Sequence, residues 1–453
     1  MGKRIFHVSP PPGAVADEIQ ILPFTYFDII WLTFHPIRRL FFYEIPYTDD
    51  VVGRLRNSLS RALKHYFPLA GKILFPVNSE EKPFLRYAPG DSVPFTIFES
   101  DGDFDALVEN SPRDSDQFYD FIPELPPEGE ESGFRTRQVL AVQVTLFPNR
   151  GICIGVTNHH TAGDATTIVG FLNFWASISK LGVGGGDNPA VKSPPLIDRS
   201  LIKDSADVGS KLWDTVRNAS YEAVVFPVPT NRVRATFTLT PSEIKKLKDS
   251  IIAKNPNFSH LSSFVVSIAY IWSCLAKSDV HHGDLSYEPE EVPGGEKDYF
   301  LFAVDCRSRL DPPLPENYFG NCVSYGLAAV PHEELVGDEG FFAAAESIAE
   351  QIKNKVNDKE RIVTDAENWA AELLPLLGKR FYSVSGSAKV DVYGLDFGFG
   401  SLRKLEMLAI DGEKYSISLC KSSGGGLEFG VSLPPAKLST FSSIFTTGKE
   451  LVG

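Results

Sequence analysis

The sequence LAVQVTLFPNRGICIGVTNHHTAGD occupies residues 140–164 and sets the local architecture around it. Apolar and polar residues alternate through its first eight positions and again from Ile152 to Thr157, and Pro148–Gly151 between them has the composition of a turn. This pattern predicts a β-hairpin whose second strand runs directly into His160. Beyond Asp164 a helix is predicted, because apolar residues recur at helical spacing. Its apolar face comprises Ile168, Phe171, Leu172, Trp175 and Ile178.

His160 is the functional residue that this arrangement suggests first. It is predicted to lie on a short loop between two rigid elements, and imidazole both accepts and donates a proton near neutral pH. Gly163 allows the loop to turn tightly, and Asp164 can orient it by pairing with an arginine. By itself, however, a His-x-x-x-Asp sequence is more often only the polar end of a strand.

Two other chemistries are less consistent with the sequence. Adjacent histidines on an extended chain point in opposite directions, and no second His/Cys cluster completes a metal site, so we expect no metal at His159 and His160. A serine hydrolase would need a Gly-x-Ser-x-Gly elbow, which is not found in this sequence. The histidine therefore has no nucleophile partner.

The length of 453 residues, about three times the common domain size, predicts two domains. The helices and strands expected along the chain indicate a mixed α/β fold. We expect an N-terminal domain over 1–190, a crossover linker over 191–210 and a C-terminal domain over 211–453, with the boundary in a stretch rich in Gly and Pro. Helices are predicted from Val51 to Tyr66, Pro241 to Ile252, Phe264 to Lys277 and Phe341 to Asn357. Strands are predicted at Tyr299–Val304, Cys322–Ala329, Val390–Leu395, Lys404–Ala409, Tyr415–Leu419 and Leu427–Leu433, with an exposed acidic loop at His281–Lys297.

The charge and cysteine content exclude several classes of function. A net charge of -14 argues against nucleic-acid and anionic-membrane partners, because both require a positive surface. The five cysteines are scattered and predict reduced thiols of a cytosolic protein. No apolar run is long enough for a signal peptide or a membrane span, so we expect a cytosolic location.

Two further motifs have turn chemistry. Asp396-Phe397-Gly398-Phe399-Gly400 follows a predicted strand, and its aspartate can lock the loop onto an arginine. Tyr318-Phe319-Gly320-Asn321-Cys322 follows Asp305-Cys306-Arg307-Ser308-Arg309 and a proline-rich turn. Each motif alone indicates only a loop.

Together, these three motifs resemble the BAHD acyltransferase family of plant specialised metabolism, whose signatures are His-x-x-x-Asp and Asp-Phe-Gly-Trp-Gly. The resemblance covers nearly the whole chain and includes the runs at 22–28, 66–71 and 430–434. The Tyr-Phe-Gly-Asn-Cys run is typical of the branch that acylates sugars of anthocyanins and other flavonoid or phenolic glycosides. One departure is Phe399, which keeps the apolar bulk of the family's Trp but lacks its indole N–H.

The resemblance implies two chloramphenicol-acetyltransferase-like domains, each a mixed sheet flanked by helices, with a channel between them. His160 would be the catalytic base for direct attack of a sugar hydroxyl on an acyl-coenzyme A. Coenzyme A thioester would be a co-substrate, with no permanently bound cofactor and no metal, and the protein would be a monomer. Asp164 would pair with Arg307. Structural roles are expected for Asp396, Gly398 and Gly400, and channel positions for Phe399, Tyr318 and Asn321.

The coenzyme A phosphates require a local cluster of positive charge on an acidic protein. Lys245, Lys246 and Lys248, with the helix N-terminus at Ser262 and Ser263, are the predicted coenzyme A site. An ordinary solvated helix face is an equal alternative for these lysines.

The sequence leaves the acyl donor open. A malonyl group needs a cation for its free carboxylate, whereas p-coumaroyl or caffeoyl needs an aromatic slot. The chain has 33 Phe and no Arg or Lys between Asp164 and Ser179, which favours a hydroxycinnamoyl donor slightly over malonyl. A catalytically silent protein that binds phenolic glycosides is the alternative of a different class, and Phe399 is the only feature in its favour.

Overall fold

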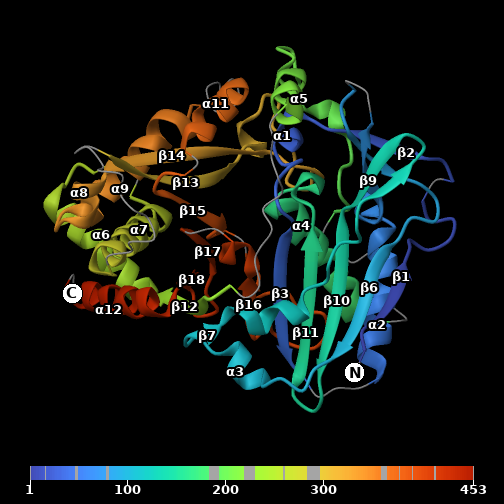
Figure 1. The fold of residues 1–453 in the computed structure, drawn as a ribbon, viewed down its shortest axis with the longest axis horizontal. Helices are drawn as coiled ribbons and strands as arrows, with labels where there is room; N and C mark the ends of the chain where they lie inside the picture. Colours follow the sequence, from blue (N-terminus) through green and yellow to red (C-terminus); the bar gives the residue numbers. More distant parts are fainter. Residues whose placement is uncertain are drawn as a thin grey trace.

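In a computed structural model, the described residues form three β-sheets, two mixed and one antiparallel, with helices around them (Figure 1). The described residues are 2–15, 17–45, 49–77, 81–182, 193–218, 230–258, 261–282, 296–358, 365–376, 378–389, 391–412 and 415–451. The predicted mixed α/β class is confirmed. None of the helices in these ranges is long and apolar enough to cross a membrane.

The predicted hairpin forms the centre of a six-stranded sheet. Leu140 lies opposite Asn158 and Phe147 opposite Gly151, so the hairpin prediction is confirmed. Every side chain in both strands is buried, because this sheet is covered on both faces. In order across the sheet the strands are β1 (Arg4–Val8), β6 (Val93–Glu99), β10 (Leu140–Phe147), β11 (Gly151–Asn158), β3 (Ile37–Glu44) and β16 (Lys404–Met407).

Two other sheets complete the fold. A five-stranded sheet has the order β2 (Gln20–Pro23), β5 (Phe84–Tyr87), β4 (Lys72–Pro76), β9 (Phe134–Gln138) and β8 (Gly129–Glu131). A seven-stranded sheet has the order β14 (Val323–Pro331), β13 (Lys297–Asp305), β15 (Phe381–Gly386), β17 (Ser416–Lys421), β18 (Leu427–Leu433), β12 (Val233–Leu239) and β7 (Arg113–Asp114). Strands β7 and β16 thus each belong to a sheet that is built mainly from the other half of the sequence.

The helices pack on these sheets and on one another. Helix α4 packs against α2, and α7 packs against α9 and α12. Of the two serines predicted at the start of α7, Ser262 is the cap, since its Oγ accepts the N–H of Val265. The helices are α1 (Tyr26–Ile29), α2 (Asp49–Leu63), α3 (Phe104–Val108), α4 (Ala165–Leu181), α5 (Val208–Asn218), α6 (Pro241–Lys254), α7 (Ser263–His282), α8 (His332–Val336), α9 (Gly340–Gln351), α11 (Trp369–Leu373) and α12 (Pro435–Leu451). A π-helical turn, Ile352–Val356, extends α9.

The sequence predictions differ from the structure in a few places. The strand predicted at Val390–Leu395 is wrong over 391–395, because Asp391 accepts the N–H of Gly394 and folds this segment into a turn. The acidic loop begins later than expected, since α7 reaches His282. Most of that loop lies outside the described residues, as do residues 191 and 192 of the predicted crossover linker.

Candidate active site

His160 lies where β11 ends and α4 begins. Its ring stacks on Trp31, with centroids 3.8 Å apart and planes 13° apart, and it meets Phe34 edge to face, with centroids 5.6 Å apart. The Nδ1 atom of His160 is buried and has no hydrogen-bond partner among the described residues. Aromatic rings therefore hold the imidazole in a fixed plane without a hydrogen bond at Nδ1.

The protonation state of this imidazole follows from its surroundings. Burial and the positive charge of Arg39 lower the pKa of His160 to about 4, although Asp164 and Asn321 act in the opposite direction. Burial also lowers the pKa of His35 to about 4 and that of His159 to about 3. His160 is thus neutral near pH 7 and able to accept a proton.

Asp164 forms the predicted ion pair with Arg307. The guanidinium donates to both carboxylate oxygens, at 2.8 and 3.0 Å, and each side chain is only 3% exposed. Asp164 also accepts the N–H of Thr167, as the N-cap of α4, and that of Cys322. It therefore anchors the His160 loop and does not face an open site.

Gly163 has a different role from the one expected. Its φ of 165° is extended backbone, so no tight turn requires a glycine. A Cβ at this position would instead lie 2.7 Å from the Cβ of Thr167. Close packing against the first turn of α4 explains the glycine.

A second buried ion pair holds the other side of the same loop. Asn321 Nδ2 donates to the main-chain carbonyls of His160 and Thr161, at 3.1 and 3.2 Å. Asp28 accepts from the side chain of Asn321 at 3.0 Å and from Arg199 at 3.2 Å. Asp28 and Arg199 had not been singled out from the sequence, although Asp28 ends one of the runs that carry the family resemblance.

Tyr318 and Asn321 were predicted to line the channel, and the structure corrects this placement. Tyr318 is 1% exposed and its hydroxyl bonds Arg199, while Asn321 is 0% exposed. Their side chains belong to the interior network that supports the loop.

The Asp396 loop lies at the opposite end of α4. Asp396 pairs with Lys180 at 2.7 Å, rather than with an arginine, and its other oxygen accepts the N–H groups of Gly398 and Gly400. At about 1.5 Å per residue, the 17 residues of α4 separate this loop from His160 by about 25 Å. Phe399 packs beneath Arg54, 4.2 Å from its guanidinium carbon, so it does not line a channel beside His160.

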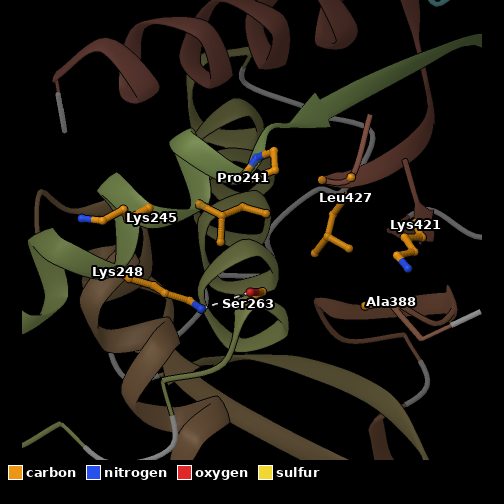
Figure 2. A pocket seen from close by; sticks show the side chains of 10 residues that line it. Pro241, Lys245, Lys248, Ser263, Ala388, Lys421 and Leu427 are labelled. Carbon is orange, nitrogen blue, oxygen red and sulfur yellow. Dashed lines mark hydrogen bonds between the residues drawn. The ribbon is translucent and has the colours of Figure 1, made fainter. Parts of the chain in front are cut away.

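The predicted coenzyme A residues converge only in part. An open pocket of about 360 Å³ is lined by Lys248, which donates to Ser263 at 3.0 Å. Lys421, at the end of β17, lies on the other side of this pocket (Figure 2). Lys245 also lines the pocket. Lys246 is exposed and does not line it, and the Ser262 side chain is occupied as a helix cap.

Neither a group of metal ligands nor a disulfide bond is found among the described residues. No group of three or more His, Cys, Asp or Glu side chains there could hold a metal ion. All five cysteines are buried and unbridged, and burial raises the pKa of Cys274 and Cys306 to about 12.

Comparison with known proteins gives consistent results. A family model described as the Transferase family matches residues 17–447. A malonyl-coenzyme:anthocyanin 5-O-glucoside-6'''-O-malonyltransferase from Salvia splendens is 45% identical, covering 97% of this chain and 93% of the relative. A coumaroyl-CoA:anthocyanidin 3-O-glucoside-6''-O-coumaroyltransferase from Arabidopsis thaliana is 34% identical, covering 98% and 96%. The crystal structure of vinorine synthase superimposes with a TM-score of 0.69 at 21% identity, covering 97% and 95%.

Proposed function

The chain belongs to the Transferase family, the BAHD acyltransferases that its motifs had predicted, and we propose that it acylates a sugar hydroxyl of an anthocyanin or related phenolic glucoside with His160 as general base. The family and the predicted chloramphenicol-acetyltransferase-like fold are confirmed, and with them the class of acyl-CoA-dependent O-acyltransferase. Relatives that use malonyl and coumaroyl donors support both donor classes considered from the sequence.

The proposed reaction is a direct transfer within a ternary complex. Neutral His160 takes the proton of the sugar hydroxyl as its oxygen attacks the thioester carbonyl, and a new C–O bond forms. The C–S bond then breaks, and the imidazolium returns the proton to the leaving thiolate. Holding both substrates beside one base supplies much of the rate enhancement.

The observation that carries this proposal is an imidazole held between Trp31 and a doubly anchored loop, where burial keeps it unprotonated near pH 7. Asn321 and Asp164 fix the main chain at His160 and in the residues that follow it. A base that stays unprotonated at cellular pH and cannot rotate freely suits repeated proton transfer.

Replacing His160 with Ala tests the role of this residue. We expect kcat to fall by about 100-fold or more, with KM for both substrates little changed. The change His7→Ala removes an exposed histidine on β1 and serves as the control for histidine loss. Near-normal turnover by His160→Ala would exclude it as the base.

For coenzyme A, we infer that the phosphates bind at the pocket of Lys245, Lys248 and Lys421, with Ser263 at its wall. Charge reversal at Lys248 should raise KM for the thioester more than tenfold with kcat nearly unchanged. Lys246→Glu makes the same charge change on the same helix outside the pocket and is the matched control. Equal effects of both variants would indicate a diffuse field rather than a site.

A silent binding protein is the second candidate, because Phe399 departs from the family motif. Its position at the far end of α4 weakens that argument. Incubation with a panel of acyl-CoAs and flavonoid glucosides, with thiol release as the readout, separates the enzyme from the binder. We further propose a monomeric cytosolic enzyme, supported by five unbridged cysteines.

A further inference from the structure

Arg39 is a partly buried arginine on the same face of the sheet as His160. It lies opposite Val156 in the antiparallel pair of β3 and β11. Because side chains alternate along an extended chain, Val156, Asn158 and His160 share that face. Arg39 Nη1 donates to Asn158 Oδ1 at 2.8 Å, which places the guanidinium at the end of β11 that leads into His160.

No carboxylate pairs with Arg39 among the residues that the structure describes. Burial lowers its pKa to about 10, so it remains charged at neutral pH, and no acidic group offsets that effect. The remaining N–H groups of its guanidinium have no partner in the described part of the chain.

The acidic side chains around this region are already committed to other cations. Glu406 on the adjacent strand β16 lies opposite Leu40, on the other face of the sheet, and pairs with Arg113 and Arg234. On the His160 side, the two buried carboxylates that hold the catalytic loop each have an arginine of their own, Asp164 with Arg307 and Asp28 with Arg199.

An arginine that is partly buried without a counter-ion is unfavourable unless a ligand supplies the negative charge. An oxyanion that exists only during the reaction does not compensate a permanent cation in the resting complex. The required ligand therefore carries a permanent anion close to the base. Of the two donor classes, only a dicarboxylic acyl group brings one to this position.

Resting on the proposed function, we propose that Arg39 is a specificity-determining residue that binds the free carboxylate of a dicarboxylic acyl-CoA, of the malonyl type. The carboxylate is held by guanidinium N–H groups that Asn158 does not occupy, and the thioester carbonyl is thereby placed at His160. Arg39 itself is unchanged in the transfer. A donor without this carboxylate has nothing to bind there.

The test compares malonyl-CoA with acetyl-CoA, which lacks the carboxylate, at pH 7.5 with one glucoside acceptor. Arg39→Gln should lower kcat/KM for malonyl-CoA by about 100-fold, mainly through KM, and change that for acetyl-CoA by less than about 3-fold. Arg39→Lys should retain an intermediate preference for malonyl-CoA, because it keeps the charge but loses the fork of donors. Arg38→Gln removes the neighbouring arginine, which points to the other face, and is the control.

The contrary outcomes are distinct. An equal fall in kcat with both donors would mean that Arg39 acts on the oxyanion or on His160, and the proposal would be wrong. A wild-type preference for p-coumaroyl-CoA over malonyl-CoA would overturn it and leave the proposed function intact. If no acyl-CoA that is tested gives thiol release, the proposed function is overturned instead. If Arg39→Gln does not fold, unaltered donor selectivity of Arg39→Lys overturns the proposal.

Discussion

At the scale of single residues, the proposed proton transfer requires an imidazole that stays neutral. Because burial and Arg39 lower the pKa of His160 to about 4, the base form predominates at all pH values well above 4. We expect kcat/KM to be flat from about pH 6 to 8 and to fall as pH drops through about 4, where His160 becomes protonated. A pH profile of thiol release measures this limb.

The same pH profile, measured on a variant that lacks the Trp31 ring, tests what controls the pKa of His160. Trp31→Ala admits water beside the imidazole, which raises its pKa toward the usual 6.5, so the acid limb should move upward. Trp31→Phe keeps an aromatic ring over the imidazole and should move the limb less. A limb unchanged in Trp31→Ala would show that the stacking does not control the protonation of His160.

Several of these residues were accessible from sequence and others were not. His160, Asp164 and Arg307 lie in motifs with recognisable spacing, and the pairing of Asp164 with Arg307 was predicted correctly. Arg39 and Trp31 approach His160 from segments more than 100 residues earlier in the chain. Only strand register and ring packing bring them there, and neither is encoded in a local pattern.

At the scale of elements, one aspartate joins three of them. Asp164 caps α4 and binds Arg307, which follows β13, and the N–H of Cys322 before β14. Asp164→Ala leaves the buried Arg307 guanidinium with only the half-exposed Asp305, 3.3 Å away, as an anionic partner, so we expect a loss of about 3–5 kcal/mol in the free energy of unfolding. Urea denaturation measures this loss. Lys180→Ala, which breaks the exposed pair with Asp396 and leaves the loop hydrogen bonds of that carboxylate in place, should cost no more than about 1 kcal/mol and is the comparison.

The loop at the other end of α4 allows a milder test. Phe399 lies beneath Arg54 and beside Tyr43 at a partly buried position. Phe399→Trp restores the family residue, and we expect kcat within about 3-fold of wild type and the free energy of unfolding to change by less than about 1.5 kcal/mol. Large activation by this change would contradict the purely structural role assigned to Phe399.

The elements themselves were mostly predictable, because helical and strand periodicities are local. The hairpin before His160 and the helix after it were predicted correctly for this reason. The strand expected at Val390–Leu395 was wrong because the Asp391 side chain bonds the main chain three residues on, which a hydrophobicity pattern does not reveal.

At the scale of the whole molecule, β16 and β7 tie the two halves of the sequence together. β16 pairs with β3 in the six-stranded sheet, and β7 pairs with β12 in the seven-stranded sheet. Alternating residues predicted a strand near Lys404, but periodicity does not specify which sheet a strand joins. We therefore expect one cooperative unfolding transition, with coincident tryptophan fluorescence and far-UV circular dichroism curves. Separate midpoints would show that the exchanged strands do not couple the halves.

The junction of these strands contains a buried charge network that makes stability depend on pH. Glu406 on β16 pairs with Arg113 at 2.6 Å and Arg234 at 3.1 Å, and Arg234 also pairs with Asp411 at 2.6 Å. Although burial opposes ionisation, Arg113 and Arg234 prevail and lower the pKa of Glu406 from 4.5 to about 2. At about 1.4 kcal/mol per pKa unit, this carboxylate contributes about 3 kcal/mol to folding above pH 4.5.

That contribution is lost as pH falls through about 2, because the folded carboxylate is then protonated as the unfolded one already is. Glu406→Gln should therefore destabilise the protein by about 3–5 kcal/mol at pH 7, where Arg113 loses its anion and Arg234 keeps only Asp411. The difference from wild type should shrink between pH 4.5 and 2. Urea titrations at several pH values measure it, and a difference that did not depend on pH would assign the effect to packing rather than to the charge that joins the two sheets.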